Sequence, residues 1–397
     1  MKDIQQLYND RVKDVLMTVN HQEPCRVPLG IDVVTWPLAY AGYKLDKEND
    51  PEELSEAYVK VFKDLCCDCI LDPGVTQAIK VYEALGGNDY KLSEDGLTVQ
   101  HVMQDYNHIM SDEEYDRLIS EPQNFFENVI PRRKYSKINT ATKAESYSAM
   151  RNAAIELRKH MELNALIERK LKDDLGLVKL WGRHGCSMHK QPFDVIFDGF
   201  RGIKGTLIDL RRRPNKVLDA INALGRIHLN EIEQLNDIET SRGKALPFGL
   251  MGFKAGPYLG LERIKKYWWP LFIEMYMPYA EAGVKIFVKC EGLNNDCLDL
   301  FSEFPKDSIV LQLEEDNPFE VYKKLGDKVT LATGMTTSLL KYGTKEQCYE
   351  YIKKTFDTFA PGGGFMFMLD RPLLSGGDAN PDTLFSVYEF AKEYGKY

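Results

Sequence analysis

Two segments of the sequence carry side chains that could bind a metal ion. An imidazole and a thiol lie two positions apart at His184 and Cys186, and another thiol, Cys290, follows an apolar run. Because proteins hold zinc with combinations of Cys, His and carboxylate side chains, we predict that Cys290, His184 and Cys186 could form a zinc site, completed by Glu291 or Glu314. The alternative is that His184 is a hydrogen-bonded loop residue and Cys186 a buried thiol.

A second group of side chains could transfer protons. The apolar run 310–313 is followed by Glu314, Glu315 and Asp316, so successive carboxylates would point to opposite faces of a strand. One of Glu314 and Glu315 could act as an acid or base, unless the three carboxylates form a solvent-exposed acidic turn. With other strand-end residues added, the catalytic residues that we predict are Glu314, Glu291, His184 and Asp32. The residues that we predict to contact a substrate are Trp36, Lys289, Met335, Asp370 and Arg371.

The elements that must position these side chains alternate along the chain. Residues 3–19 have the apolar spacing of a helix, and later apolar runs are separated by helical patterns long enough to connect parallel strands. We expect eight strands, the number that closes a barrel whose catalytic groups project from the carboxyl ends of the strands. The expected strands lie at residues 26–32, 69–71, 177–180, 246–252, 284–288, 309–313, 329–332 and 365–369.

The prediction is therefore an α/β fold, a (β/α)8 TIM-type barrel that forms one domain over residues 1–397 with an N-terminal helical extension. A dinucleotide-binding fold is the weaker alternative, because no Gly-x-Gly-x-x-Gly follows the first strand. Residues 88–180 interrupt the alternation with a hairpin-like segment at 90–105 and a polar helix pattern from Lys143 to Leu175. We predict that 88–180 is a helical insertion that lies over the barrel mouth as a lid.

Charge and composition limit the partners of the chain. The 397 residues have a formal net charge of -9, which repels a phosphate backbone, so we expect no nucleic-acid partner. The first 20 residues lack the apolar core of a signal peptide, and no run approaches about 18 apolar residues. We therefore expect a cytoplasmic protein without a membrane segment, whose eight cysteines are reduced.

Three further segments have a structural and a functional interpretation. The cluster Cys66-Cys67-Asp68-Cys69 could bind metal, but it lacks a second cysteine pair nearby, so buried core thiols are favoured. The pair Trp268-Trp269 is expected to pack in the core or at a subunit interface, which would make the protein a homo-oligomer. The run 361–364 precedes a strand rather than a helix, so a tight turn is favoured over a phosphate-binding loop.

Four segments of the second half follow a recognisable family pattern. They are Pro192-Phe193-Asp194 with Arg201-Gly202, Met251-Gly252 with Tyr267-Trp268-Trp269-Pro270, Leu325-Gly326-Asp327 with Gly334-Met335-Thr336-Thr337-Ser338, and Pro361-Gly362-Gly363-Gly364-Phe365. They resemble the uroporphyrinogen-decarboxylase superfamily, which includes decarboxylases and cobamide-dependent methyltransferases. The likeness spans roughly residues 175–395.

Departures from the family pattern favour one branch. The decarboxylases carry arginines after the first strand, whereas residues 30–37 have none, and Asp32 with Trp36 suits a smaller, less anionic ligand. The thiol-activating methyltransferases hold zinc with a His-x-Cys pair and a later Cys. Here Val288 stands in place of that His before Cys290, and residues 369–374 contain no Cys. The remaining branch is the corrinoid-protein methyltransferases that demethylate substrates such as methoxylated aromatics.

The resemblance thus implies a corrinoid-dependent methyltransferase that moves a methyl group from a small methylated substrate to Co(I) of a corrinoid protein. The corrinoid (cobalamin) would arrive with that partner, because nothing resembles a cobalamin-binding Asp-x-His-x-x-Gly segment. O-demethylation leaves a phenolate, which needs a proton or a Lewis acid such as zinc. One alternative is a decarboxylase that holds carboxylates with Arg183, Lys254 or Arg371. The other is a non-catalytic barrel that docks a corrinoid protein.

Overall fold

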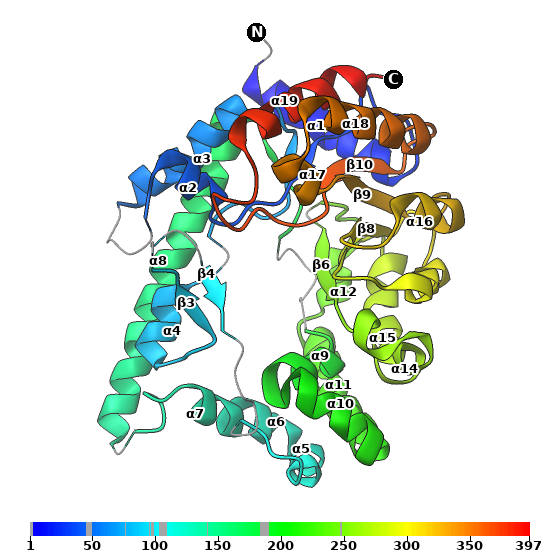
Figure 1. The fold of residues 1–397 in the computed structure, drawn as a ribbon. Coiled ribbons are helices and arrows are strands. Elements are labelled where there is room, and N and C mark those ends of the chain that lie inside the picture. The colour runs from blue at the N-terminus through cyan, green and yellow to red at the C-terminus, as the bar shows by residue number, and fades with distance from the viewer. Residues whose placement is uncertain are drawn as a thin grey trace.

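In the part of the chain that the structure describes, eight parallel strands form the centre, as the spacing of apolar runs predicts. The computed structural model describes residues 3–44, 50–75, 77–94, 96, 99–102, 109–140, 142–182, 190–246 and 248–397 (Figure 1). The parallel strands are β1 Gly30–Ile31, β2 Cys69–Ile70, β5 Val178–Lys179, β6 Gly249–Phe253, β7 Ile286–Cys290, β8 Ile309–Leu313, β9 Thr330–Met335 and β10 Phe365–Leu369.

The strands are arranged in two sheets whose edges contact each other. One sheet has the order β1-β2-β5 and the other has the order β10-β9-β8-β7-β6. Parallel bridges Leu29–Phe367 and Trp181–Phe248 connect β1 with β10 and the end of β5 with the start of β6. The amide of Phe367 donates to the carbonyl of Pro28 at 3.0 Å, so the first of these edges is hydrogen-bonded.

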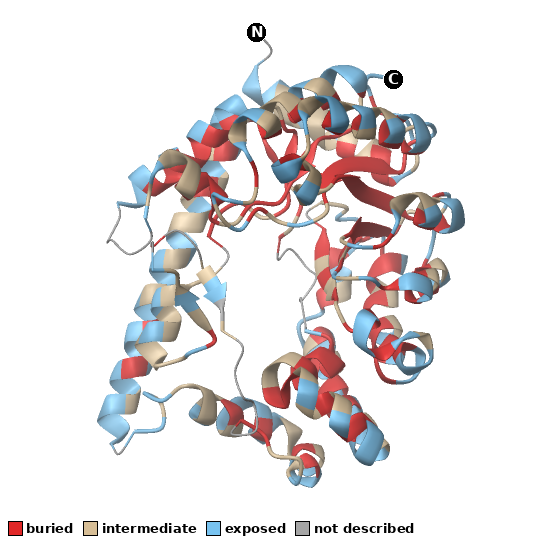
Figure 2. Ribbon diagram, in the orientation of Figure 1, coloured by how far each residue is buried: buried red, intermediate tan, exposed pale blue. Residues whose placement is uncertain are grey.

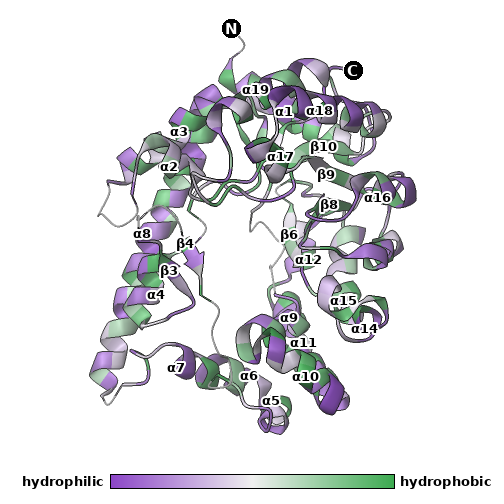
Figure 3. Ribbon diagram, viewed as in Figure 1, coloured by the Kyte–Doolittle hydropathy of each residue, from purple (hydrophilic) through white to green (hydrophobic). Residues whose placement is uncertain are grey.

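Burial on both faces explains why the strands are continuous apolar runs. Every residue of β8, β9 and β10 is buried, as expected for parallel strands that are covered on both sides. A cluster inside the strands joins alternate residues such as Phe287, Val310 and Met366, together with Val15 and Val19 of the first helix. In Figure 2 the parallel strands are buried, while exposed residues follow the outer faces of the helices; the ribbon of Figure 3 is coloured as hydrophilic along much of these outer faces.

Helices connect and surround the strands. Around the strands lie α1 Ile4–Val19, α2 Trp36–Ala41, α3 Pro51–Asp64, α13 Gly256–Leu259, α14 Leu261–Tyr267, α15 Trp269–Glu281, the 3-10 helix Asn295–Glu303, α16 Pro318–Leu325, α17 Thr337–Tyr342, α18 Lys345–Phe359 and α19 Pro381–Tyr394. A second group comprises α4 Ile79–Leu85, α5 Tyr115–Ser120, α6 Pro122–Asn124, the π-helix Phe125–Val129, α7 Ile130–Lys134, α8 Lys143–Leu175, α9 Pro192–Asp194, the π-helix Val195–Phe200, α10 Gly202–Arg212, α11 Pro214–Gln234 and α12 Asp237–Ser241.

The segment 88–180 contains the hairpin and the long helix that the sequence predicts. Strands β3 Tyr90–Leu92 and β4 Val99–His101 pair antiparallel, and α8 begins and ends at the predicted residues. Thr142 caps α8 by accepting from the amide of Glu145, and Gly176 ends it with φ 63°, a conformation that glycine adopts readily. The helix packs against α3 and α4, and a lid function of this segment stays a prediction.

The structure also decides three local alternatives. Cys67 and Cys69 are buried free thiols, and Trp268 and Trp269 are buried in the core, as predicted. The run 361–364 forms a turn in which Gly362, Gly363 and Gly364 have positive φ. None of the helices in the described ranges is both long and apolar enough to cross a bilayer.

Candidate active site

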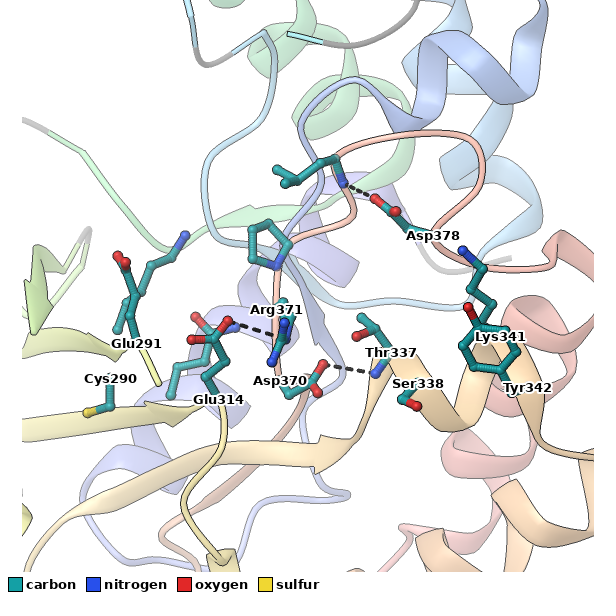
Figure 4. A pocket seen from close by; sticks show the side chains of 14 residues that line it. Cys290, Glu291, Glu314, Thr337, Ser338, Lys341, Tyr342, Asp370, Arg371 and Asp378 are labelled. Carbon is teal, nitrogen blue, oxygen red and sulfur yellow. Dashed lines mark hydrogen bonds and ion pairs between the residues drawn. The ribbon is translucent and has the colours of Figure 1, made fainter. Parts of the chain in front are cut away.

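A pocket of about 670 Å³ opens at the carboxyl ends of β7, β8 and β10 beside α17 (Figure 4). This is the edge at which enzymes with parallel strands place their catalytic groups. Five predicted site residues line the pocket, namely Lys289, Glu291, Glu314, Asp370 and Arg371, and so does the predicted ligand Cys290. The sequence reasoning had not selected the other lining residues, which are Gln312, Thr337, Ser338, Lys341, Tyr342, Pro372, Leu374 and Asp378.

Lys289 brings a cation to the pocket and pairs with a predicted catalytic residue. Its ammonium donates to the carboxylate of Asp32, which follows β1, whereas Lys289 belongs to β7 of the other sheet. The Asp32 side chain is only 6% exposed and that of Lys289 is 25% exposed. The carbonyl of Asp32 accepts from the amide of Leu373 at 3.0 Å, which fixes the backbone beside the pocket. A cation is therefore held on the pocket wall by a buried carboxylate.

The three successive carboxylates after β8 have three different positions. Glu314 lines the pocket and accepts a hydrogen bond from the amide of Gly292. Its Oε1 also forms an ion pair with Arg371 Nε at 3.2 Å. Glu315 is more exposed and contacts Arg371 Nη2 at 3.1 Å. Asp316 is buried and accepts from the amides of Asn294 and Asn295, so it holds the turn after β7. Glu314 is thus the member of the triplet that is directed into the pocket.

Asp370 and Gln312 add polar atoms to the centre of the pocket. Asp370 Oδ1 accepts from the amide of Thr337 at 2.9 Å, and burial raises the pKa of Asp370 although that hydrogen bond opposes the rise. Gln312 interrupts the apolar strand β8 and is 3% exposed. Its Nε2 donates to the carbonyl of Leu369 at 2.9 Å, while its Oε1 has no hydrogen-bond partner among the described residues. In the sequence, Gln312 is a polar residue within the apolar run 309–313, and this could have marked it as a candidate site residue.

Cys290 is a core thiol at the edge of the pocket. It is buried, its Sγ faces the carbonyl of Val288 at 3.9 Å, and burial raises its pKa well above the usual value of a thiol. The predicted ligands His184 and Cys186 lie outside the described residues. Among the residues that the structure does describe, no group of three His, Cys, Asp or Glu side chains is arranged to hold a metal ion.

Trp36 and Met335 lie in the hydrophobic core and not among the pocket-lining residues. Trp36 is 1% exposed and stacks on Tyr40, with ring centroids 5.4 Å apart, because α2 turns its indole toward the helices. Met335 ends β9 and is packed with Leu369 in the outer core. The neighbouring residues Thr337 and Ser338 face the pocket in place of Met335.

Asp72, Lys179 and Glu168 form a second set of charges, at the carboxyl ends of β2 and β5 and on α8. Asp72 follows β2 and its Oδ1 is 3.9 Å from Lys179 Nζ, which in turn contacts Glu168 of α8 at 2.8 Å. Burial raises the pKa of Asp72 to about 6, Lys179 opposes that rise, and the negative charge of Asp32 adds to it. Asp72 is thus a carboxyl group whose protonation can change near neutral pH.

A further polar group surrounds Lys254 at the end of β6. Lys254 forms an ion pair with Asp198, which also contacts Lys190 at 3.1 Å. The nearby Asp194 is buried and accepts from Trp268 Nε1 at 3.2 Å through one oxygen, while the other oxygen has no partner in the described part of the chain. Burial, and then the charge of Asp198, raise the pKa of Asp194 to about 7.

The fold and the site together define an α/β protein with a pocket at the carboxyl ends of its parallel strands. Comparison with solved structures finds a similar fold in a methyltransferase from Methanosarcina mazei, with a TM-score of 0.58 and 10% sequence identity over 99% of each chain. At this identity the likeness concerns the fold alone. The sequence matches no protein-family model and no curated protein.

Proposed function

We propose that the two sheets form one (β/α)8 barrel of the uroporphyrinogen-decarboxylase superfamily. The support is that the bridges Leu29–Phe367 and Trp181–Phe248 join both pairs of sheet edges, giving each of the eight strands two neighbours. The family-like segments in residues 175–395 support this assignment, and the similar fold of the Methanosarcina mazei methyltransferase is consistent with the methyltransferase branch of that superfamily.

Within that superfamily, we propose that the chain is a methyltransferase that moves a methyl group from a small methylated substrate, such as a methoxylated aromatic, to a corrinoid protein. The observation that carries this proposal is the pocket of about 670 Å³ with Lys289, Glu314, Asp370 and Arg371 on its wall. Its volume suits a small molecule rather than a substrate together with a corrin ring. The corrinoid would therefore stay on its own protein, docked at the pocket mouth, where it would supply the nucleophilic cobalt.

The residues of this chain would bind the substrate and provide a proton. Lys289 faces the pocket with its ammonium held by Asp32, so it can donate a proton to the oxygen or nitrogen that loses the methyl group. Arg371 bridges Glu314 and Glu315, which fixes this part of the pocket wall. If a zinc ion binds, the predicted ligands His184, Cys186 and Cys290 would hold it, and it would act as a Lewis acid on the leaving oxygen.

The observed ion pairs weigh against the decarboxylase alternative. A substrate with several carboxylates needs free cations, yet Lys254 is paired with Asp198 and Arg371 with Glu314 and Glu315. The third basic candidate, Arg183, lies outside the described residues. Charge compensation within the protein leaves these two cations less available to an anionic substrate.

A methyl-transfer assay tests the proposal. The purified chain would be mixed with a reduced corrinoid protein and with methoxyarenes, methylamines or methanol, with and without zinc, while the absorbance of the corrinoid is followed. We expect methylation with one donor class, and a decrease in kcat of about 100-fold for Lys289→Met. Lys323→Met, on the exposed face of α16, is the matched control. Failure with every donor, although the corrinoid protein accepts methyl groups from a known methyltransferase, would refute the proposed function.

A further inference from the structure

Two of the three cations in the pocket are neutralised by the protein, and the third is not. The three basic residues that line the pocket are Lys289, Lys341 and Arg371. Lys289 is paired with the carboxylate of Asp32, and Arg371 contacts the two glutamates after β8 at 3.2 and 3.1 Å. Lys341 Nζ lies 5.5 Å from the ring centroid of Tyr342 but has no carboxylate partner among the residues that the structure describes. One ammonium group in the pocket therefore lacks a counter-ion.

Two aspartates of the pocket wall are bound by backbone amides instead of by Lys341. Asp370 Oδ1 accepts from the amide of Thr337 at 2.9 Å. Asp378 Oδ2 accepts from two amides of the loop after β10, both at 2.7 Å. Because hydrogen bonds to a charged acceptor are strong, these amides hold both carboxylates in place. The ammonium of Lys341 thus remains available to a ligand.

Helix α17 brings Lys341 and a hydroxyl group to one end of the pocket. Ser338, Lys341 and Tyr342 line the pocket, and their spacing of three and four positions places side chains on one face of a helix. In Figure 4 these three residues lie at one end of the pocket, whereas Cys290 and Glu291 lie at the other. Strand β8 separates β7 from β9, the strand before α17, so β7 and β9 are about 10 Å apart. A molecule with a single aromatic ring can therefore contact both ends.

We propose that the methyl donor carries one carboxylate, which the ammonium of Lys341 and the hydroxyl of Ser338 bind at the α17 end of the pocket. This inference rests on the proposed function and names its substrate class, a methylated molecule with a single negative charge. The methylated oxygen or nitrogen then faces Lys289 at the β7 end. The two oxygens of a carboxylate match one ammonium and one hydroxyl donor. A second carboxylate would find no unpaired cation on the described part of the pocket wall.

The charges of the pocket favour one orientation of such a substrate. Four described carboxylate residues line the pocket, and one of them, Glu291, lies at the end opposite Lys341 (Figure 4). An anionic group is therefore repelled from the β7 end and attracted to the α17 end. Because Lys341 is exposed, salt should weaken this attraction.

Equilibrium binding of two matched ligands tests the inference without a corrinoid protein. The probes are para-methoxybenzoate and para-methoxybenzamide, which have similar shapes but differ in charge. By isothermal titration calorimetry, we expect the wild type to bind the acid about 5- to 10-fold more tightly than the amide, with a smaller preference at high salt. Lys341→Met should bind both ligands equally, and Lys341→Arg should retain the preference. Lys323→Met, on the exposed face of α16, is the control.

Methyl-transfer kinetics separate this inference from the proposed function. With the acid as donor, Lys341→Met should raise KM about 5- to 10-fold while kcat changes less than twofold, because the carboxylate is bound away from the reacting methyl group. Equal wild-type affinities for acid and amide, no binding of either ligand, or a preference that survives in Lys341→Met would overturn the inference. If only neutral donors are demethylated, the inference is wrong while the proposed function stands. If the acid binds through Lys341 but no donor methylates an active corrinoid protein, the proposed function is wrong and the carboxylate site stands.

Discussion

The ammonium of Lys289 on β7 contacts the carboxylate of Asp32 after β1, although the two strands belong to different sheets and the residues are 257 positions apart. Because the Asp32 side chain is only 6% exposed, its charge is stable only with a partner of opposite sign. The ion pair therefore connects the two sheets across the strand ends and also places a cation on the wall of the pocket. One contact serves both the fold and the proposed chemistry.

Removing one partner of this pair should destabilise the protein more than removing both. Lys289→Met leaves a buried carboxylate without its cation, and we expect a loss of about 3 kcal/mol in the free energy of unfolding at pH 7. In the double variant Asp32→Asn with Lys289→Met, no charge remains uncompensated, so the loss should be about 1 kcal/mol. Urea denaturation of the single and double variants measures both values. A loss in the double variant equal to the sum of the losses in Lys289→Met and Asp32→Asn would show that the pair is not energetically coupled.

Glu314 and Glu315 provide a matched test of the pocket wall. Both contact Arg371, but only Glu314 lines the pocket and also accepts from the amide of Gly292. We expect Glu314→Gln to decrease kcat/KM for methyl transfer about tenfold or more, while Glu315→Gln changes it less than twofold. Steady-state kinetics of the two variants would decide the point. A larger decrease in kcat/KM for Glu315→Gln than for Glu314→Gln would place the substrate outside the pocket.

The buried Asp194 should make stability depend on pH. Its pKa is raised to about 7 in the folded state against about 3.9 in an unfolded chain, so the folded protein binds more protons between these values. Stability should therefore decrease as the pH rises from about 4 to about 7. Asp194→Asn abolishes this dependence and should be more stable than the wild type at pH 8 by on the order of 2 kcal/mol. Thermal unfolding across pH, with exposed Asp219→Asn as control, measures the effect. A parallel pH dependence of variant and wild type would contradict it.

Gly334 should be required for the packing of β9. It has φ +131°, and a Cβ at this position would lie 2.6 Å from Cδ2 of Phe367 on the neighbouring strand β10. Gly334→Ala should therefore cost about 2 to 3 kcal/mol of stability. Gly252→Ala is the control, since its Cβ would have only an ordinary contact, at 3.7 Å, with Glu291 Oε1. Chemical denaturation distinguishes the two. Equal stability of the two alanine variants would mean that β9 can shift away from Phe367.

Sequence periodicity was sufficient for the strands and for α8. The runs at residues 309–313 and 365–369 are β8 and β10 with the predicted bounds, and the polar pattern from Lys143 to Leu175 is one helix. These elements follow local rules, because strands that are buried on both faces must be apolar throughout and a long helix must repeat its buried face along one side. The segment at 26–32 was harder, since only Gly30 and Ile31 of it form a regular strand.

The site was only partly determined by local sequence. A strand end indicates that Asp32, Lys289, Glu314, Asp370 and Arg371 could meet, but it does not say which side chain points inward. Trp36 and Met335 also follow or end predicted strands, as those five residues do. They nevertheless lie in the core, because α2 and β9 turn their side chains toward the helices. His184 and Cys186 lie outside the described residues, so their predicted roles stay predictions.

The sequence by itself determined an α/β chain with eight apolar strands, a long helical insertion and candidate polar residues at the strand ends. Only the tertiary structure decided that Lys289 pairs with Asp32 and that Gln312 and α17 complete the pocket. The physical reason is the range of the interactions involved. Periodicity and capping act over a few residues, whereas these contacts join strands that are distant in sequence, and their geometry depends on the packing of the whole core.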